Sequence, residues 1–175
     1  MPVKSISGNN YILITVFRNY IKFNAFSDRS ATSYAKLFRE VTEFINSKKP
    51  KELRFQRIDG ETSKEVEDYF RQHLPRIDVL KAPPSQHRTN SAERAMQTAK
   101  YHLRSIWSGA DESCPKYLWD KALIHAEITL NQVRTYSMNK SISAWTVLWG
   151  SPFDFNAFSI APWGTSLLAF VSLSD

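Results

Sequence analysis

Cysteine is nearly absent from the sequence, with Cys114 alone among 175 residues. A single cysteine excludes an internal disulfide framework and any cysteine-rich zinc site within the chain. No apolar run approaches the roughly 18 residues that a membrane-spanning helix requires, and the first residues lack the apolar region of a signal peptide. We therefore expect an intracellular protein of a reducing compartment, with no membrane partner.

Internal repeats, low-complexity tracts and Gly/Ser linkers are also missing, which makes one compact domain the simplest expectation. Hydrophobic residues form 42% of the chain and aromatic residues 13%, a composition typical of a folded core. We divide the chain into a domain over residues 1–150 and an irregular C-terminal extension over residues 151–175, where Pro152, Pro162 and Gly164 stand among aromatic residues.

Positive charge exceeds negative charge along the chain. Lys and Arg number 23 against 17 Asp and Glu, which gives a formal net charge of +6. The sequence pI is about 9.5. This balance favours a polyanionic partner, although an ordinary basic protein would carry the same charge. A nucleic-acid partner therefore needs further support from the pattern of residues.

The first half of the chain predicts a hairpin followed by a helix. Two β-rich runs, at 11–17 and 20–26, are separated by Arg18-Asn19 and predict an antiparallel pair. Apolar residues then recur at helical spacing over 31–46, and Ser30 is suited to cap that helix.

The rest of the chain predicts alternating strands and helices. A strand at 52–58, a short helix over 62–72 and a strand at 77–80 have the order of a βαβ crossover. Two longer helices are expected over 90–107 and 117–134, from their caps and apolar spacing. The complete order is β-β-α-β-α-β-α-α, which predicts an α/β fold.

Two acidic residues lie where a metal site is commonly built. Asp59 follows the predicted strand 52–58, and Glu93 lies in the first turn of the predicted helix 90–107. Carboxylates that converge from rigid elements suit Mg²⁺ or Mn²⁺. The spacing alone is weak evidence, because a chain with 17 acidic residues contains many such pairs. Asp59 is also explained as a turn residue, and Glu93 as a solvated residue at the start of a helix.

The helix that carries Glu93 also predicts a basic surface. At about 100° per residue, Gln97, Lys100 and Arg104 fall within roughly 40° of Glu93. The apolar residues fall on another side: Ala92, Met96, Ala99, Leu103 and Ile106. Such a polar face suits a phosphate backbone beside a metal. We predict nucleic-acid contacts from five side chains: Arg88, Arg94, Gln97, Lys100 and Arg104.

The segment from Ala82 to Lys100, APPSQHRTNSAERAMQTAK, resembles the signature around the last catalytic glutamate in integrases of copia-type LTR retrotransposons. It rests on Pro83-Pro84, His87-Arg88, Asn90 and Ala92-Glu93-Arg94-Ala95. Further stretches match the same family in the same order: residues 8–13, 56–59, 118–120, 126–131, 152–156 and 161–162. The resemblance covers nearly the whole chain and is specific as a set.

The resemblance implies a ribonuclease H-like α/β fold with a central mixed sheet and flanking helices. By the same resemblance, Asp59 and Glu93 are the second and third acids of a D-D-E triad that holds two divalent ions, Mg²⁺ or Mn²⁺, for DNA integration by polynucleotidyl transfer. The first acid of these integrases lies on a strand before the hairpin, and this first strand is largely missing here. Asp28 and Glu61 are interpreted as solvated loop residues and not as substitutes.

Three functions stay open at this point: an active nuclease or strand transferase, a non-catalytic nucleic-acid-binding module, and a transposon relic without function. The missing first acid argues against the first, and the basic helix face leaves binding feasible. Expected partners are duplex DNA, contacted mostly at phosphates, and a second copy of the chain, and a functional protein would act in the nucleus. Four tryptophans are expected in the core: Trp107, Trp119, Trp145 and Trp149. His87 and His125 need no metal role.

Overall fold

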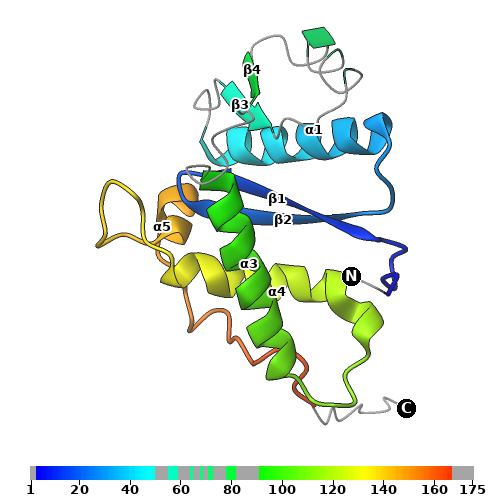
Figure 1. The fold of residues 1–175 in the computed structure, drawn as a ribbon. Helices are drawn as coiled ribbons and strands as arrows, with labels where there is room; N and C mark the ends of the chain where they lie inside the picture. The colour runs from blue at the N-terminus through cyan, green and yellow to red at the C-terminus, as the bar shows by residue number, and fades with distance from the viewer. Residues whose placement is uncertain are drawn as a thin grey trace, which may run out of the picture.

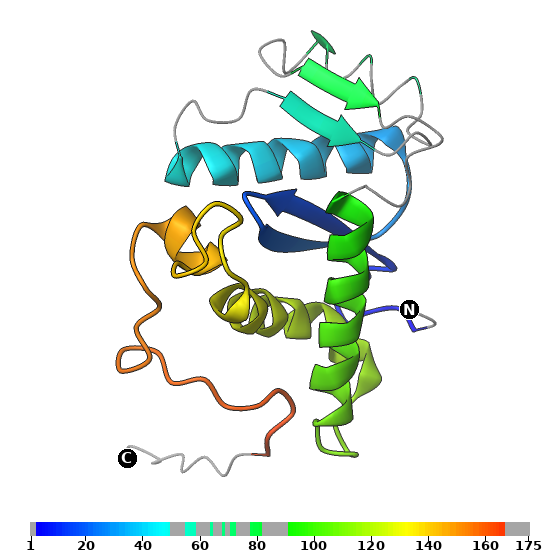
Figure 2. The same ribbon diagram turned by 60° about the vertical axis from the view of Figure 1, so that its left-hand side comes forward.

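The computed structural model describes residues 3–49, 55–58, 64, 68, 71, 72, 78–81 and 91–166. The described strands and helices follow the order expected from the sequence, with one short helix added near the end. In both views, helix α1 lies between the first pair of strands and the second pair, and α3 and α4 lie on the other side of the first pair (Figures 1 and 2).

The expected hairpin is confirmed. Strands β1 (Tyr11–Phe17) and β2 (Tyr20–Phe26) pair antiparallel over their whole length. The two connecting residues, Arg18 and Asn19, have φ angles of 48° and 74°. Two consecutive residues with positive φ form the turn whose twist matches that of the paired strands. Asparagine adopts this conformation more readily than most residues, which explains its place in the turn.

Both faces of the hairpin are covered by helices. One face carries three cross-strand pairs: Ile12–Ala25, Ile14–Phe23 and Val16–Ile21. These pairs pack into the main core with side chains of α3 (Ser91–Ser108) and α4 (Trp119–Val133), among them Ala99, Leu123 and Ala126. On the other face the ring of Phe26 lies 5.4 Å from that of Tyr34 in α1 (Ala31–Lys48). Tyr20 packs there with Ala144 and Leu148 of α5 (Ala144–Trp149).

Side chains of α4 satisfy the free edge of β2. The fully buried Asn131 accepts a hydrogen bond from the Ile21 N–H at 2.8 Å and donates one to the Ile21 carbonyl at 2.7 Å. Glu127 accepts from the Phe23 N–H at 3.1 Å, and Arg134 donates to a carbonyl of the hairpin turn at 2.9 Å. The i, i+4, i+7 spacing puts these side chains on one face of the helix, so α4 takes the place of a neighbouring strand.

The described strands form two separate pairs. Strands β3 (Phe55–Ile58) and β4 (Asp78–Lys81) are parallel, as the predicted βαβ crossover requires. Within the described residues the two pairs are not joined into one sheet. The mixed α/β class is therefore confirmed, whereas the single central sheet implied by the resemblance is not seen there. The predicted helix over 62–72 lies mostly outside the described residues.

The long helices form close to where the sequence predicts them. Ser30 caps α1, and its hydroxyl accepts a hydrogen bond from the Ser33 N–H at 3.2 Å. Helix α4 falls within its predicted range, and α3 ends one residue beyond its own. A short 3₁₀ turn, η2 (Lys116–Leu118), leads into α4. None of the helices described here combines the length and apolarity needed to cross a membrane.

The described residues after α5 form no further helix or strand, and they run back toward the end of α3 (Figure 2). The Trp163 ring lies 6.0 Å from Trp107 of α3 and 6.5 Å from His125 of α4. At Gly164, where φ is 75°, a Cβ would lie 2.7 Å from the Cβ of Ala110. Residues 151–166, the described part of the predicted extension, thus form no helix or strand, and Trp163 and Gly164 lie close to α3, α4 and the loop between them.

Candidate nucleic-acid interface

The inner side of α3 fixes the direction in which its outer side points. Ala95, Ala99 and Leu103 are 2%, 0% and 7% exposed and belong to the main core. Alanine side chains at this spacing let the helix lie close against the hairpin. The side chains on the opposite face of the helix are therefore held outward by the packing of the core.

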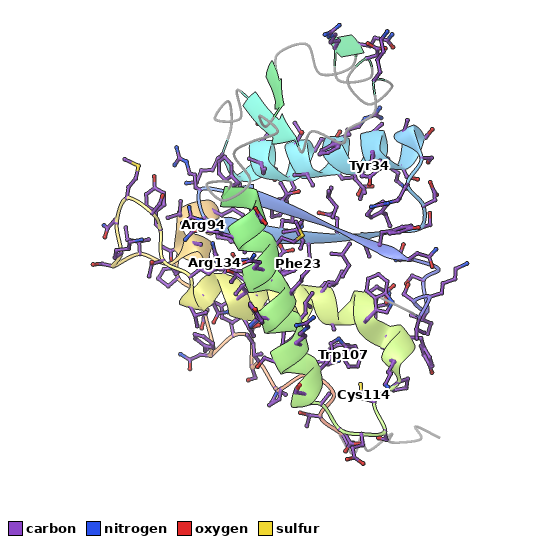
Figure 3. The ribbon with its side chains drawn as sticks, in the orientation of Figure 1. Phe23, Tyr34, Arg94, Trp107, Cys114 and Arg134 are labelled. Atoms are coloured by element: carbon purple, nitrogen blue, oxygen red, sulfur yellow. The ribbon has the colours of Figure 1, made fainter. Side chains whose placement is uncertain are left out.

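The outer side of α3 carries the predicted basic surface, which we call the α3 basic face. Its residues are all exposed: Arg94, Gln97, Lys100 and Arg104. Figure 3 labels Arg94 near the beginning of the helix. No ion pair within the described ranges involves any of these three cations, whereas Lys22 and Glu127 pair at 3.4 Å. Unpaired cations on one helix face keep their charge available to phosphate groups.

Glu93 is the one predicted metal ligand that the structure describes. It lies in the first turn of α3 and is partly buried, in a position where the helix dipole favours a negative charge. Within the described part of the chain, no group of three His, Cys, Asp or Glu side chains is arranged to hold a metal ion. Asp59 and Arg88 lie outside the described residues, so the convergence of Asp59 with Glu93 stays a prediction.

Asp28 has a structural role at the start of α1. Its carboxylate accepts hydrogen bonds from the Ser30 N–H at 2.9 Å, the Ser33 hydroxyl at 2.9 Å and the Ser27 hydroxyl at 2.8 Å. The bonds from Ser30, followed by those from Ser27 and Ser33, hold the pKa of the Asp28 carboxyl below its usual range. This confirms Asp28 as a loop residue, and Glu61 lies outside the described residues.

Two histidines connect α3 with α4. His102 Nε2 lies 2.9 Å from the Thr129 hydroxyl, and that hydroxyl donates to the His125 carbonyl at 2.8 Å. Burial lowers the pKa of His102, and the nearby His125 lowers it further. Burial also lowers the pKa of His125. Both side chains are thus held toward the neutral form at a helix contact, and His87 lies outside the described residues.

The tryptophans divide between core and surface. Trp119 is 2% exposed, which confirms its predicted place in the core. Trp107 and Trp145 are partly buried against the two core clusters. Trp149 stacks on Trp145 with ring centroids 4.9 Å apart, but it stays 38% exposed, and the Lys48 ammonium lies 4.0 Å from its ring. The core assignment therefore holds only in part for Trp149.

Several residues that carry the integrase resemblance have structural roles. The Asn9 amide donates to the Asp120 carboxylate at 3.2 Å, which joins two of the matching stretches that lie far apart in the chain. Asn131 and Glu127, from a third stretch, bind the edge of β2. These contacts hold the hairpin and α4 together. None of them involves the α3 basic face, so these residues have a structural role apart from that face.

Tyr101 is a residue of the basic face that the sequence analysis missed. It lies on α3 between Arg94 and Arg104, and its side chain is 68% exposed. The signal was available, because Tyr101 is seven residues after one arginine and three before the other, spacings that share a helix face. Tyrosine belonged neither to the apolar stripe nor to the cations, so the pattern did not select it.

Comparisons with known proteins give a likeness of fold. No protein-family model matches the chain, and no curated protein sequence matches it. Among solved structures, it is similar to a chain of the simian T-cell lymphotropic virus intasome, determined in complex with the PP2A regulatory subunit B56 gamma. The TM-score is 0.55 at 15% identity, over 91% of this chain and 54% of that chain. The chain thus spans about half of its neighbour's length, and at this identity the likeness concerns the fold alone.

Proposed function

We propose that this chain is an integrase-like domain of a copia-type retrotransposon that binds DNA through the α3 basic face. The observation that carries the proposal is the row of exposed cations beside Glu93, for which no ion-pair partner exists among the described residues. The similarity of fold to an intasome chain supports the same reading. DNA integration takes place in the nucleus, which is the site of action that we propose.

The contacts that we propose are mainly to phosphate oxygens of duplex DNA. Arg94 and Arg104 can each present a planar fork of donors to a phosphate, and Lys100 adds a point charge. Gln97 adds a neutral donor on the same face. Phosphate contacts fix the position of a protein on DNA without reading its sequence, so binding should depend little on base composition.

Binding of labelled duplex DNA over a range of salt concentrations tests this proposal. We expect affinity to fall steeply with salt, and the double variant Lys100→Ala/Arg104→Ala to reduce the slope of log affinity against log salt by about 2. The matched control is Lys140→Ala, an exposed lysine in the loop before α5. Absence of binding at low salt, or a slope near zero, would show that the face is an ordinary solvated surface.

We further propose that Asp59 and Glu93 share divalent cations, Mg²⁺ or Mn²⁺, as the integrase resemblance implies. When bound, such ions activate water or a DNA 3′-hydroxyl and stabilise the leaving oxygen in phosphoryl transfer. No residue of this sequence corresponds to the first acid of the triad in that resemblance. We therefore propose that the chain by itself binds these ions weakly and does not catalyse strand transfer.

A second candidate function is a nucleic-acid-binding module without catalysis. It is favoured by the exposure of the cations, because phosphate binding needs no metal ion. The two candidates differ in what Asp59→Asn and Glu93→Gln do to DNA binding. In a metal-dependent site these variants weaken DNA binding when Mg²⁺ is present, whereas in a purely electrostatic module they strengthen it slightly with or without Mg²⁺. A transposon relic would show neither binding nor activity.

A further inference from the structure

An exposed aromatic ring lies on the α3 basic face, and binding of phosphates by the cations of that face does not require it. Tyr101 is 68% exposed, and no hydrogen bond, ring contact or cation contact joins its side chain to another described residue. At about 100° per residue, it points within roughly 20° of Arg94 and about 60° of Arg104. The ring therefore stands among the cations and not beside the apolar side of the helix.

The surroundings of Tyr101 are charged and polar. Its neighbours three and four residues away on the helix are Gln97, Thr98, Arg104 and Ser105, and Arg94 lies one turn further along the same side. Thr98 is half-buried, and the others are exposed. Met96 and Ala99 lie on other sides of the helix, so the ring is not the edge of an apolar patch. An aromatic ring interleaved with cations is the combination that binds unpaired nucleotides: the cations hold the backbone and the ring stacks on a base.

The stacking partner must be a base whose flat face is accessible. Inside a duplex, each base is covered above and below by its neighbours, and a ring on a helix surface reaches only phosphates and groove edges. In a single strand or an overhang the bases separate readily and expose their faces. A tyrosine at this position thus adds affinity for unpaired bases and little for the interior of a duplex.

We propose that Tyr101 is a base-stacking residue and that the α3 basic face binds nucleic acid with unpaired bases more tightly than fully paired duplex. This rests on the proposed nucleic-acid binding at the same face and narrows its substrate class. Arg94, Lys100 and Arg104 hold phosphates on either side of the ring. Because every base has a flat face, the preference is for unpaired structure and not for a particular sequence.

The test uses the full chain and three fluorescein-labelled DNA probes: a thymidine single strand of about 20 nucleotides, a blunt duplex of similar length, and the same duplex with a short thymidine overhang. Tyr101→Ala is expected to weaken binding of the single strand and the overhang about tenfold, and binding of the blunt duplex less than about twofold. Tyr101→Phe and Tyr101→Trp keep a ring and should retain wild-type affinity for all three probes.

Two further variants separate stacking from other effects. Ile124→Ala removes an equally exposed side chain, 68% accessible on α4, and should change none of the affinities. Arg104→Ala should weaken binding of all three probes alike and reduce the salt dependence of binding.

Photo-crosslinking of a 5-iodouracil probe should join the base to Tyr101, as located by mass spectrometry. Thermal melting of each variant shows that the removal of an exposed side chain leaves the fold intact.

The outcomes distinguish this proposal from the proposed function. If wild-type protein binds the duplex with steep salt dependence and Tyr101→Ala changes the three affinities equally or not at all, stacking is wrong and the phosphate-binding face stands. If Tyr101→Ala alters only self-association in sedimentation, the ring belongs to a contact between copies, and stacking is again wrong. If wild-type protein binds none of the probes at low salt, both proposals are wrong.

Discussion

Asn131 shows how one side chain can replace a strand at a sheet edge. Its amide satisfies both the N–H and the carbonyl of Ile21, and its own side chain is fully buried. A buried amide with these bonds is stable because each polar group has a partner, whereas a buried backbone group without one costs about 1 to 3 kcal/mol. The buried amide of Asn131 therefore stabilises the folded protein, although burial of a polar side chain without partners would destabilise it.

Replacement of Asn131 by leucine should destabilise the protein strongly. Leucine keeps the branched shape and the number of side-chain heavy atoms but is larger, and the N–H and carbonyl of Ile21 lose their partner, so we expect the free energy of unfolding to fall by about 2 to 4 kcal/mol. Urea denaturation followed by circular dichroism measures the change. The control is Gln97→Leu, which replaces an exposed amide on α3 and should cost less than about 0.5 kcal/mol. Equal losses in the two variants would contradict the clamping role of Asn131.

His102 and His125 should make stability depend on pH. The folded protein holds the pKa of both below their ordinary value of 6.5, so the unfolded chain binds more protons at mildly acidic pH. Stability from these residues is thus present above about pH 6.5 and is lost as the pH falls through their folded pKa values. Urea denaturation between about pH 7.5 and 5 should show this decline. The decline should become shallower in His102→Gln/His125→Gln, and an unchanged slope in this variant would contradict the assignment.

At the scale of elements, the C-terminal extension gives a sharp packing test. Gly150 and Gly164 have nearly equal φ angles, 81° and 75°. A Cβ at Gly150 would meet no atom within 4 Å, whereas one at Gly164 would lie 2.7 Å from the Cβ of Ala110 and 3.3 Å from the sulfur of Cys114. The two glycines therefore share the same backbone requirement and differ in their surroundings.

Alanine at Gly164 should cost more stability than alanine at Gly150. Both variants carry the strain of a positive φ, about 1 kcal/mol, and only Gly164→Ala adds a collision with the loop after α3. We expect Gly164→Ala to melt at a lower temperature than Gly150→Ala, with a change in fluorescence as Trp163 moves from Trp107. Equal melting temperatures and unchanged fluorescence would mean that the extension contributes little to the packed structure.

The elements that the sequence predicted are those whose signals are local. The hairpin needed only two β-rich runs and a two-residue turn, and α1 needed a cap at Ser30 and a periodic stripe. Helix α5, six residues long, was missed because it is too short to show a period, although Ser143 and Gly150 cap its two ends. The hydrogen bonds from α4 to the edge of β2 join residues more than a hundred positions apart, and no local pattern in the sequence predicts such contacts.

The candidate site was predictable to the extent that it follows from helix geometry. Arg94, Gln97, Lys100 and Arg104 share an exposed face because the buried alanines of α3 fix its orientation. Whether Glu93 meets Asp59 depends on how a strand end approaches a helix end, which residue spacing does not determine. Tyr101 could not be assigned to the same face from its spacing alone, because a tyrosine ring is found in cores as well as on surfaces. The structure shows that its side chain is exposed among the cations.

For the whole molecule, the net charge favours a polyanionic partner, while phosphoryl transfer requires a complete set of metal ligands. The net charge of +6 favours association with any polyanion, and the α3 basic face gives it a direction. Phosphate binding needs only exposed cations, whereas transfer of a phosphoryl group needs metal ions held in fixed positions. Binding and catalysis can therefore be separated in this chain by experiment.

The chain should show no strand-transfer or 3′-processing activity with Mg²⁺ or Mn²⁺, even when it is folded and bound to DNA. Two divalent ions about 4 Å apart repel each other strongly, and clustered carboxylates are needed to hold them. If Asp59 and Glu93 are the metal ligands, as we propose, two carboxylates should hold at least one of the ions weakly, and groups that act as a unit lose their function together. The assay compares the native chain with Asp59→Asn and Glu93→Gln on a labelled DNA substrate, with duplex binding measured in parallel. Metal-dependent cleavage by the native chain that both variants lose would contradict this prediction, and would mean that another residue supplies the third ligand.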